Sequence, residues 1–395
     1  MRNRDFRRLL LASIVSLAGD WFSFVAVASL VTELTGRAGA AAFVYAATVL
    51  PVFLVSPIAG TLADRFDRKR ILVTADLVRV PIALLLCLAA WWGSTPLAIT
   101  AMIALAVGSS FSDPIATAAT PNLVAADELA SAQSLMGAVW GSMLIVGAGI
   151  GGIVAELFGR QTAFVIDALS FLVSGWLIAG IRRPMQEART PTHEHGSMRE
   201  ALDYIRGNPI VKRLVFAKVG VSSANGIVGL LPTFATRQFA GTSIATGLFF
   251  AARGLGAMTG PIVARGVVGA TPSRRAIVLV CSASTLTYCS FYMVFPLTQV
   301  FPLAMLLVIL AHLGGGAQWT LSTYGLQRET PDQFRGRVLS LDYGIATLAI
   351  GVSAVAAGLF ADAYGEAAAM GWLTAIGITY GIAWLAWSFS ALRAP

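Results

Sequence analysis

The sequence predicts an all-helical membrane protein, an all-α fold with about twelve transmembrane helices in two pseudo-symmetric six-helix bundles. Hydrophobic residues make up 56% of the chain and charged residues only 12%, about half the charged fraction of a soluble domain. The apolar residues come in windows of about 20, the length that a helix needs to cross the hydrocarbon core. Basic residues gather in alternate connections between these windows, which indicates a fixed orientation.

The apolar windows divide into two sets of six around a polar stretch. Residues 182–209 separate the sets, and residues 197–206 are expected to form a short surface helix before the Asn208-Pro209 break. We therefore expect an N-terminal bundle over residues 1–181, a cytoplasmic linker over 182–209 and a C-terminal bundle over 210–395. The expected spans are 9–34, 41–63, 71–92, 96–119, 132–157 and 161–181, followed by 210–236, 243–266, 275–295, 299–325, 337–361 and 368–391.

The distribution of positive charge predicts the orientation. Loops expected outside the cell hold only Arg37, Arg160 and Arg237, whereas most other Lys and Arg residues lie in segments on the opposite side. Positively charged loops stay in the cytoplasm, so both termini are expected there. The net charge of +8 thus reflects topology, and we expect no nucleic-acid partner. Few Lys and many Arg and Ala residues favour a GC-rich bacterial genome, and hence the bacterial inner (cell) membrane.

A short charged link, GTLADRFDRKR over residues 60–70, joins the second and third expected spans. Gly60 permits the close approach of another helix. Asp64 lies at the C-terminal end of its helix, where the dipole disfavours an acid, so it needs a partner such as a neighbouring helix N-terminus. The remaining cluster is typical of a cytoplasmic link: Arg65, Arg68, Lys69 and Arg70.

This link resembles the first signature of the major facilitator superfamily, Gly-x-Leu-Ala-Asp-Arg-x-Gly-Arg-Lys-x-x-Leu, which ends here at Leu72. Asp67 replaces the second glycine. The resulting sequence ADRFDRKR resembles that found in the drug/proton antiporter branch, which contains macrolide-efflux and enterobactin-exporter-like carriers. The resemblance implies the fold of that superfamily, with a central cavity between two halves and transport by alternating access.

Charged residues in the cytoplasmic loops are expected to form the inner gate. Under the fold that the resemblance implies, Asp64 lies near Arg335 and Arg337 at the start of the eleventh span. This cluster would join the halves on the cytoplasmic side and stabilise the outward-open state. The alternative is that these residues are solvated loop charges.

A second gate cluster is expected on the same side. The link over residues 121–131 carries Asp127 and Glu128 and no Lys or Arg, which is an exception among the cytoplasmic links. The implied fold places it near Arg274 and Arg275, whose charge is opposite. Solvated loop charges are again the alternative.

Two ionisable residues are expected near the middle of the membrane. Asp20 lies twelve residues after Arg8, roughly 18 Å along a helix at about 1.5 Å per residue, and Arg253 lies at similar depth in the eighth span. Unpaired charges there are costly and usually functional. We interpret Asp20 as the proton-titrating or substrate-contacting acid, with Arg253 as its partner or a substrate clamp. A fixed ion pair between helices is the alternative.

Other charged residues within the spans have local interpretations. Asp76 and Arg79 are three residues apart on one helix face and are expected to form a local ion pair. Asp113 precedes Pro114 and either lines the cavity or satisfies backbone groups that the proline frees.

Three further residues are assigned to membrane interfaces. Glu156 and Asp167 are expected near the outer membrane face. Lys218 lies close enough to the inner end of the seventh span for its side chain to reach the interface.

Glycines in the fifth expected span indicate close helix packing, in particular Gly147, Gly151 and Gly152. The run GAGIGG resembles the antiporter signature Gly-Pro-x-x-Gly-Gly, with Ala148 in place of the proline. That change keeps the packing role and weakens the inference to antiport.

No metal, cofactor or catalytic site is expected. His193 and His195 lie in the linker without a third ligand, and no phosphate-binding loop is found. An enzyme would need a polar catalytic cluster at one membrane face, and the sequence offers none.

The expected function is secondary active transport. The leading interpretation is efflux of a lipophilic or amphipathic small molecule (a drug, macrolide or siderophore-like compound) by alternating access, with H+ as the coupling ion and a monomeric protein. A lipid- or lysophospholipid-flipping carrier and a non-transporting membrane receptor are the alternatives.

Overall fold

The structure is a computed structural model that describes residues 3–125, 128–186, 198–269 and 271–392. It leaves out the side chains of residues 56–65, 113, 130–131, 133–134, 137, 332–333 and 391–392.

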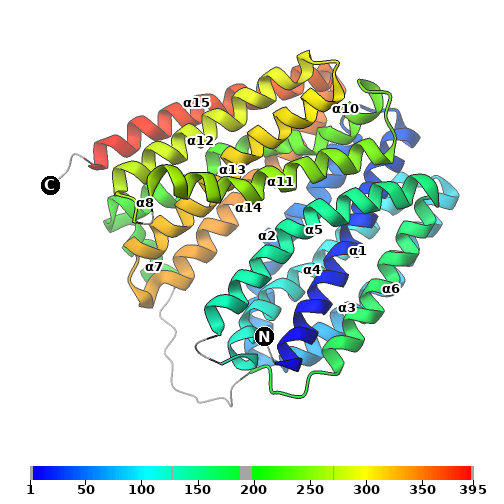
Figure 1. Cartoon of the computed structure of the whole chain (residues 1–395), viewed down its shortest axis with the longest axis horizontal. Helices are drawn as coiled ribbons and strands as arrows, with labels where there is room; N and C mark the ends of the chain where they lie inside the picture. The colour runs from blue at the N-terminus through cyan, green and yellow to red at the C-terminus, as the bar shows by residue number, and fades with distance from the viewer. Residues whose placement is uncertain (1–2, 126–127, 187–197, 270, 393–395) are drawn as a thin grey trace. The chain divides into compact units, whose positions relative to one another are not determined.

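All regular secondary structure in the described residues is helical (Figure 1). The first helices are α1 (Arg4–Thr35), α2 (Ala40–Arg65), α3 (Arg68–Trp92), α4 (Thr95–Leu123), α5 (Leu129–Leu157) and α6 (Arg160–Ala179). The central part contains α7 (Met198–Gly207), α8 (Pro209–Val215), α9 (Val219–Ala224), the 3-10 helix η1 (Asn225–Leu230) and α10 (Leu231–Arg237). The last are α11 (Ser243–Val268), α12 (Arg274–Val294), the 3-10 helix η2 (Phe295–Leu297), α13 (Phe301–Glu329), α14 (Asp332–Tyr364) and α15 (Glu366–Leu392).

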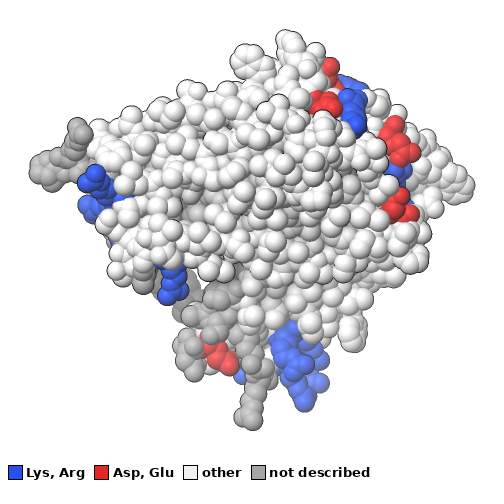
Figure 2. Space-filling view, turned by 45° about the horizontal axis from the view of Figure 1, so that its top comes forward, with Lys and Arg blue, Asp and Glu red and all other residues white. Residues whose placement is uncertain are grey.

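The lengths and composition of these helices confirm the prediction of an all-helical membrane protein. Within the described residues, 11 helical segments are long and apolar enough to cross a membrane, and α2 adds the shorter apolar stretch Ala40–Val55. Figure 2 shows a face that is uncharged over most of its area, with Lys, Arg, Asp and Glu at its margins. Large apolar side chains such as Ile262, Trp176 and Leu359 are exposed, as expected for a lipid-facing surface.

The helices form two compact units. Unit 1 consists of residues 1–189 and 231–251, and unit 2 consists of residues 190–230 and 252–395. In unit 1, α1 packs against α2, α4, α5, α6 and α10, and α3 packs against α4 and α6. In unit 2, α12 packs against α13 and α15, and α14 packs against α9, η1 and α15. The units follow spatial contacts, so the domain boundaries expected at residues 181 and 209 stay a prediction.

The seventh expected span is not one continuous helix, which corrects the sequence interpretation. Its backbone turns between α8 and α9, where Phe216 and Ala217 bond three residues back. Side chains from other helices satisfy the carbonyl groups that the turn leaves free: Gln318 donates to the Ala217 carbonyl at 2.8 Å, and Tyr380 donates to that of Phe216 at 2.8 Å. Irregular backbone at membrane depth requires such internal partners.

The expected surface helix of the linker is present as α7, and Asn208 then caps α8 by accepting from the Val211 amide at 3.3 Å. Tyr204 on α7 stacks on Phe334 with a centroid distance of 4.8 Å and donates to the Glu329 carbonyl at 2.8 Å. Burial raises the pKa of the Tyr204 phenol, the Asn208 hydrogen bond lowers it, and the Glu329 charge raises it. These contacts fix α7 to the ends of α13 and α14.

Glycines set the close packing of α11 on α13 within unit 2. A Cβ atom at Gly260 would lie 2.9 Å from the Ala317 amide nitrogen, and one at Gly256 would lie 2.9 Å from His312 Cβ. A Cβ atom at Gly316 would collide with the Ala257 carbonyl. Such small-residue seams allow helix backbones to touch in membranes.

We expect Gly316→Ala to lower the free energy of unfolding in detergent by about 1–3 kcal/mol, because the added methyl meets backbone that cannot rotate away. Gly371→Ala in α15 is the matched control, since no atom lies within 4 Å of the place that the added methyl would take. The control should be neutral or stabilising by up to about 1 kcal/mol, the helix preference for Ala over Gly. Equal unfolding temperatures for both variants would contradict this packing.

Candidate functional site

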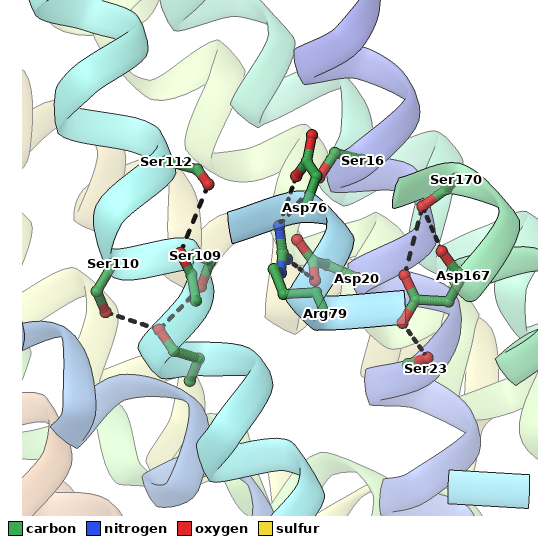
Figure 3. Close-up of polar contacts among 12 residues, drawn as sticks. Ser16, Asp20, Ser23, Asp76, Arg79, Ser109, Ser110, Ser112, Asp167 and Ser170 are labelled. Atoms are coloured by element: carbon green, nitrogen blue, oxygen red, sulfur yellow. Dashed lines mark hydrogen bonds and ion pairs between the residues drawn. The ribbon is translucent and has the colours of Figure 1, made fainter. Parts of the chain in front are cut away.

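Arg79 on α3 lies at the centre of a buried cluster of charged side chains in unit 1 (Figure 3). One terminal nitrogen, Nη2, lies 2.5 Å from Oδ1 of Asp20 on α1. The other, Nη1, lies 3.6 Å from Oδ1 of Asp76 on α3 and donates to Ser16 Oγ at 3.2 Å. Phe171 on α6 covers the guanidinium, with Arg79 Cζ 3.9 Å from the ring centroid, which is a cation–π contact.

The members of this cluster differ in their exposure. The side chain of Arg79 is 1% exposed and that of Asp76 is 3% exposed, whereas the side chain of Asp20 is 28% exposed. A group that exchanges a proton needs access from outside the packed core. Among these three residues, Asp20 is therefore best placed to gain or lose one.

Asp167 on α6 is a third acid in this region, and it is fully buried. Ser23 on α1 donates to its Oδ2, and Ser170 Oγ lies 3.5 Å from its Oδ1. Within the described residues, no cation lies within ion-pair distance of Asp167. Its polar contacts thus come from hydroxyl groups.

Two glycines make room for these side chains. A Cβ atom at Gly19 on α1 would lie 2.5 Å from Asp167 Oδ1, and one at Gly108 on α4 would lie 2.7 Å from both Cγ and Cδ of Arg79. Real Cβ atoms do not approach other atoms so closely. The absence of side chains at these two positions lets α1 approach α6 and lets Arg79 lie against α4.

The cluster combines three carboxyl groups with one guanidinium. An arginine stays charged in proteins, and a buried carboxylate without a cation is strongly disfavoured. Arg79 Nε and Asp76 Oδ2 are also buried with no hydrogen-bond partner among the described residues. Such an arrangement is suited to binding and releasing protons.

The structure tests the predicted interactions of the charged residues within the membrane spans. The local Asp76–Arg79 ion pair is confirmed, with the atoms 3.6 Å apart. Asp20 takes Arg79 as its ion partner, whereas Arg253 lies buried in α11 and interacts electrostatically with His312. The role of Arg253 in substrate binding stays a prediction.

Two interfacial assignments are wrong. Asp167 lies inside unit 1 because α1 offers it Ser23 and a glycine at position 19. Lys218 is 2% exposed and forms an ion pair with Asp342 on α14 in unit 2, so its side chain does not reach an interface. Glu156 accepts a hydrogen bond from the Ser243 amide at the start of α11, at 3.2 Å.

Lys218 and Asp342 form a second buried ion pair that the sequence interpretation missed. Lys218 Nζ also donates to Thr323 Oγ1 at 2.9 Å and lies 5.1 Å from the Trp319 ring centroid. Tyr343 meets the same Trp319 ring edge-on at 6.2 Å. The sequence feature that could have indicated this pair is Asp342 itself, an acid inside the apolar run VLSLDYGIATL. A buried acid there needs a cation beside it.

The described basic residues of the 60–70 link bind carbonyl groups within unit 1. Arg68 donates to the carbonyls of Ala118 at 2.8 Å and Met185 at 3.3 Å, and Lys69 donates to that of Ile181 at 2.9 Å. Cations are favourable at helix C-terminal ends. The side chains of Asp64 and Arg65, and the surroundings of Gly60, lie outside the described part of the chain.

The gate residues of unit 2 also have partners within their own unit. Arg274 forms a two-point contact with Glu329, at 3.0 and 2.6 Å, and Arg275 lies 5.9 Å from the Phe389 ring centroid. Arg335 donates to the Gln327 carbonyl at 3.2 Å.

The other residues of the predicted gate clusters are Arg337, Glu128 and Asp127. Arg337 lies 3.9 Å from Glu200 on α7, and Glu128 precedes α5 without a side-chain cap bond. Asp127, His193 and His195 and the side chain of Asp113 lie outside the described residues. The two cross-half clusters stay a prediction.

The predicted packing glycines of α5 lie where other helices come close. A Cβ atom at Gly147 would lie 3.2 Å from Trp21 Cβ, and one at Gly151 would lie 2.9 Å from Phe22 Cα. At Gly152 it would lie 2.5 Å from the Ser243 carbonyl of α11. These residues therefore line the contacts of α5 with α1 and with the first turn of α11, inside unit 1.

Comparison with known proteins relates this architecture to transporters. The chain is 25% identical over 374 residues to the multidrug efflux pump Tap of Mycobacterium tuberculosis, covering 90% of this chain and 87% of that protein. It is 23% identical over 363 residues to macrolide efflux protein A of Streptococcus pyogenes, covering 89% and 88%. The uncharacterized MFS-type transporter YkuC of Bacillus subtilis is 26% identical over 277 residues. This match covers 66% of this chain and 64% of YkuC, which is less than two thirds of that protein.

Solved structures share the fold at low sequence identity. A bacterial homolog of the human lysosomal transporter Spinster superposes with a TM-score of 0.72 and 14% identity, covering 99% of this chain and 96% of that one. The nucleoside transporter NupG gives 0.77 and 11% identity, covering 97% and 99%. Residues 1–393 match the family described as "Transmembrane secretion effector". The chain therefore belongs to the transmembrane secretion effector family of the major facilitator superfamily, and it is a membrane transporter, not an enzyme.

Proposed function

We propose that this transporter exports a lipophilic or amphipathic small molecule in exchange for protons, and that Asp20 is the group that gains and loses the proton. The names of two relatives, a multidrug efflux pump and a macrolide efflux protein, support export and the substrate class. The cluster around Arg79 supports the coupling.

The observation that carries the proposal is the imbalance of charge in this cluster. Asp20 and Asp76 contact the one guanidinium of the cluster, and Asp167 interacts with it electrostatically, so a cluster without net charge holds two protons. The ion pair of Asp20 with Arg79 competes with proton binding to Asp20, and the accessible surface of Asp20 gives the proton a route. Buried ionisable groups of this kind mark proton pathways in transporters.

Coupling follows when the proton stabilises one conformation more than the other. Protonation of Asp20 removes its attraction to Arg79 and frees the guanidinium to turn to the remaining acids. Because Arg79 joins α1, α3 and α6 through Asp20, Asp76 and Phe171, this exchange changes the contacts between three helices. Binding of the substrate to the deprotonated form then completes the exchange.

The setting that we propose follows the positive-inside pattern of the sequence. The protein lies in the bacterial inner membrane with both termini in the cytoplasm. It works as a monomer, in a lipid bilayer, without a bound cofactor and with H+ as the coupling ion.

The first test uses Asp20→Asn in proteoliposomes with an imposed pH gradient and a radiolabelled macrolide. We expect the variant to lose gradient-driven transport and to keep counterflow of the macrolide, because a neutral residue cannot carry the proton and exchange of substrate for substrate needs none. Glu33→Gln is the matched control on the same helix, since Glu33 pairs with Arg160 at an exposed position.

Wild-type pumping by Asp20→Asn would exclude Asp20 as the coupling group. A parallel assay with a fluorescent lysophospholipid tests the lipid-flipping alternative. Movement of the lipid by the wild type, without movement of the macrolide, would reassign the substrate class.

The second test measures the stability of Arg79→Met in detergent. We expect a loss of about 3–5 kcal/mol at neutral pH, the cost of leaving buried acids without their cation. The loss should shrink as the pH falls, because the native variant, which lacks the cation, binds more protons than the native wild type.

Arg206→Met is the control, because Arg206 pairs with Asp203 at an exposed position and such pairs contribute at most about 1 kcal/mol. A loss for Arg79→Met that is as small as the control's, or that grows as the pH falls, would contradict the assigned role of Arg79.

A further inference from the structure

We propose that Asp167 is a second proton carrier of this transporter, which passes its proton to Asp20 and then takes over the guanidinium of Arg79. This inference rests on the proposed proton exchange and adds a residue and a direction to it. It makes Asp167 part of the coupling machinery and not a structural acid.

The surroundings of Asp167 leave its charge unbalanced unless it is protonated. The carboxyl is fully buried and lies within hydrogen-bond distance of the hydroxyls of Ser23 and Ser170, which can accept a hydrogen bond as well as donate one. A carboxylic acid satisfies these partners without a charge, whereas a carboxylate in the same place lacks a cation at contact distance among the described residues.

The order of contacts along α1 places Asp167 on one side of the Asp20–Arg79 pair. Ser16, four residues before Asp20, bonds to Arg79, and Ser23, three residues after Asp20, bonds to Asp167. At about 1.5 Å per residue, these two serines are about 10 Å apart along the helix. The Asp167 carboxyl lies beside α1 between Gly19 and Ser23. Its backbone lies nearer the Thr35 end of α1 than Asp20 does, because Glu33 pairs with Arg160 at that end and Asp167 follows Arg160 more closely than Asp20 precedes Glu33. The proposed topology places that end outside the cell.

Arg79 is positioned to change partners. Its guanidinium lies on the ring of Phe171, which is four residues after Asp167 and therefore one turn away on the same face of α6. The guanidinium thus already rests against the helix that carries Asp167. Arg79 and Asp167 already interact electrostatically in this structure.

The O–H bond of the Asp167 carboxyl breaks and an O–H bond forms on the Asp20 carboxylate, through the Ser23 hydroxyl, which gives up one proton as it receives another. Arg79 then pairs with the new Asp167 carboxylate. Release of the proton from Asp20 toward the cytoplasm, and uptake of one by Asp167 in the alternate conformation that opens to the outside, restore the initial state.

The other charged groups around Asp167 are compatible with this role. Asp20 and Arg79 act on it electrostatically, and Asp76 on α3 also contacts Arg79. Arg160 lies at the start of α6. The remaining charged residues of the packed helices lie toward their ends: Arg4, Asp5, Arg7, Arg8 and Glu33 on α1, Arg68, Lys69 and Arg70 on α3, and Glu128 and Glu156 beside and on α5.

The test compares Asp167→Asn with Asp20→Asn and the Glu33→Gln control in the same proteoliposomes, with a radiolabelled macrolide as the probe. Asparagine is close in size to a protonated aspartate and can bond to both serines. We expect Asp167→Asn to lose gradient-driven transport while its counterflow stays at the wild-type rate.

The proposal is overturned by gradient-driven transport at the wild-type rate in Asp167→Asn, or by loss of counterflow together with pumping, which would mark a structural role. If Asp20→Asn loses pumping while Asp167→Asn keeps it, only this inference fails. If Asp20→Asn pumps normally, the proposed function itself fails.

A second variant decides the matter if Asp167→Asn does not fold. Ser23→Ala removes the hydroxyl bonded to Asp167 and keeps every carboxyl group. Slower gradient-driven transport with wild-type counterflow would support the proposal, and wild-type rates in both assays would overturn it.

Discussion

The packing of unit 1 depends on the burial of one guanidinium, that of Arg79, among three carboxyl groups. Arg79 is almost completely buried, and its contacts come from α1, α3 and α6. A charge that cannot reach water must be balanced where it lies, so these helices must remain within reach of one another whenever the cluster is closed. The same constraint makes the cluster sensitive to protons, because each proton changes which carboxyl needs the cation.

Small residues and hydroxyl groups allow this enclosure in a chain that is otherwise apolar. Gly19 and Gly108 remove the side chains that would occupy the space of Asp167 and Arg79. Ser16, Ser23 and Ser170 supply hydrogen bonds that neither lipid nor the aliphatic core can offer. Unit 2 meets the same physical requirement with Lys218, Asp342 and Thr323, placed beside a turn in the backbone where other side chains satisfy the free carbonyl groups. Arg79 in unit 1 and Lys218 in unit 2 thus each lie beside a carboxyl group.

The fold could be predicted from the sequence because apolar length and charge distribution depend on the bilayer and not on tertiary detail. The site could be predicted only in part. The Asp76–Arg79 pair is local and follows from helical spacing, and Asp20 stood out by its depth. The partnership of Asp20 with Arg79 and the burial of Asp167 depend on which faces of α1, α3 and α6 meet, and a single sequence does not contain that register. Lys218 was misplaced for a related reason, since its depth was judged on a continuous helix that the structure shows to be broken.

The central claim is that carboxyl groups in the Arg79 cluster hold protons at neutral pH and release one when substrate binds. Infrared difference spectroscopy of the purified transporter, with and without a macrolide, measures the C=O stretch of protonated carboxyl groups directly. The account predicts a protonated-carboxyl band in the wild type that changes on macrolide binding and is altered in Asp20→Asn. A spectrum without any protonated-carboxyl signal that depends on these residues would contradict it.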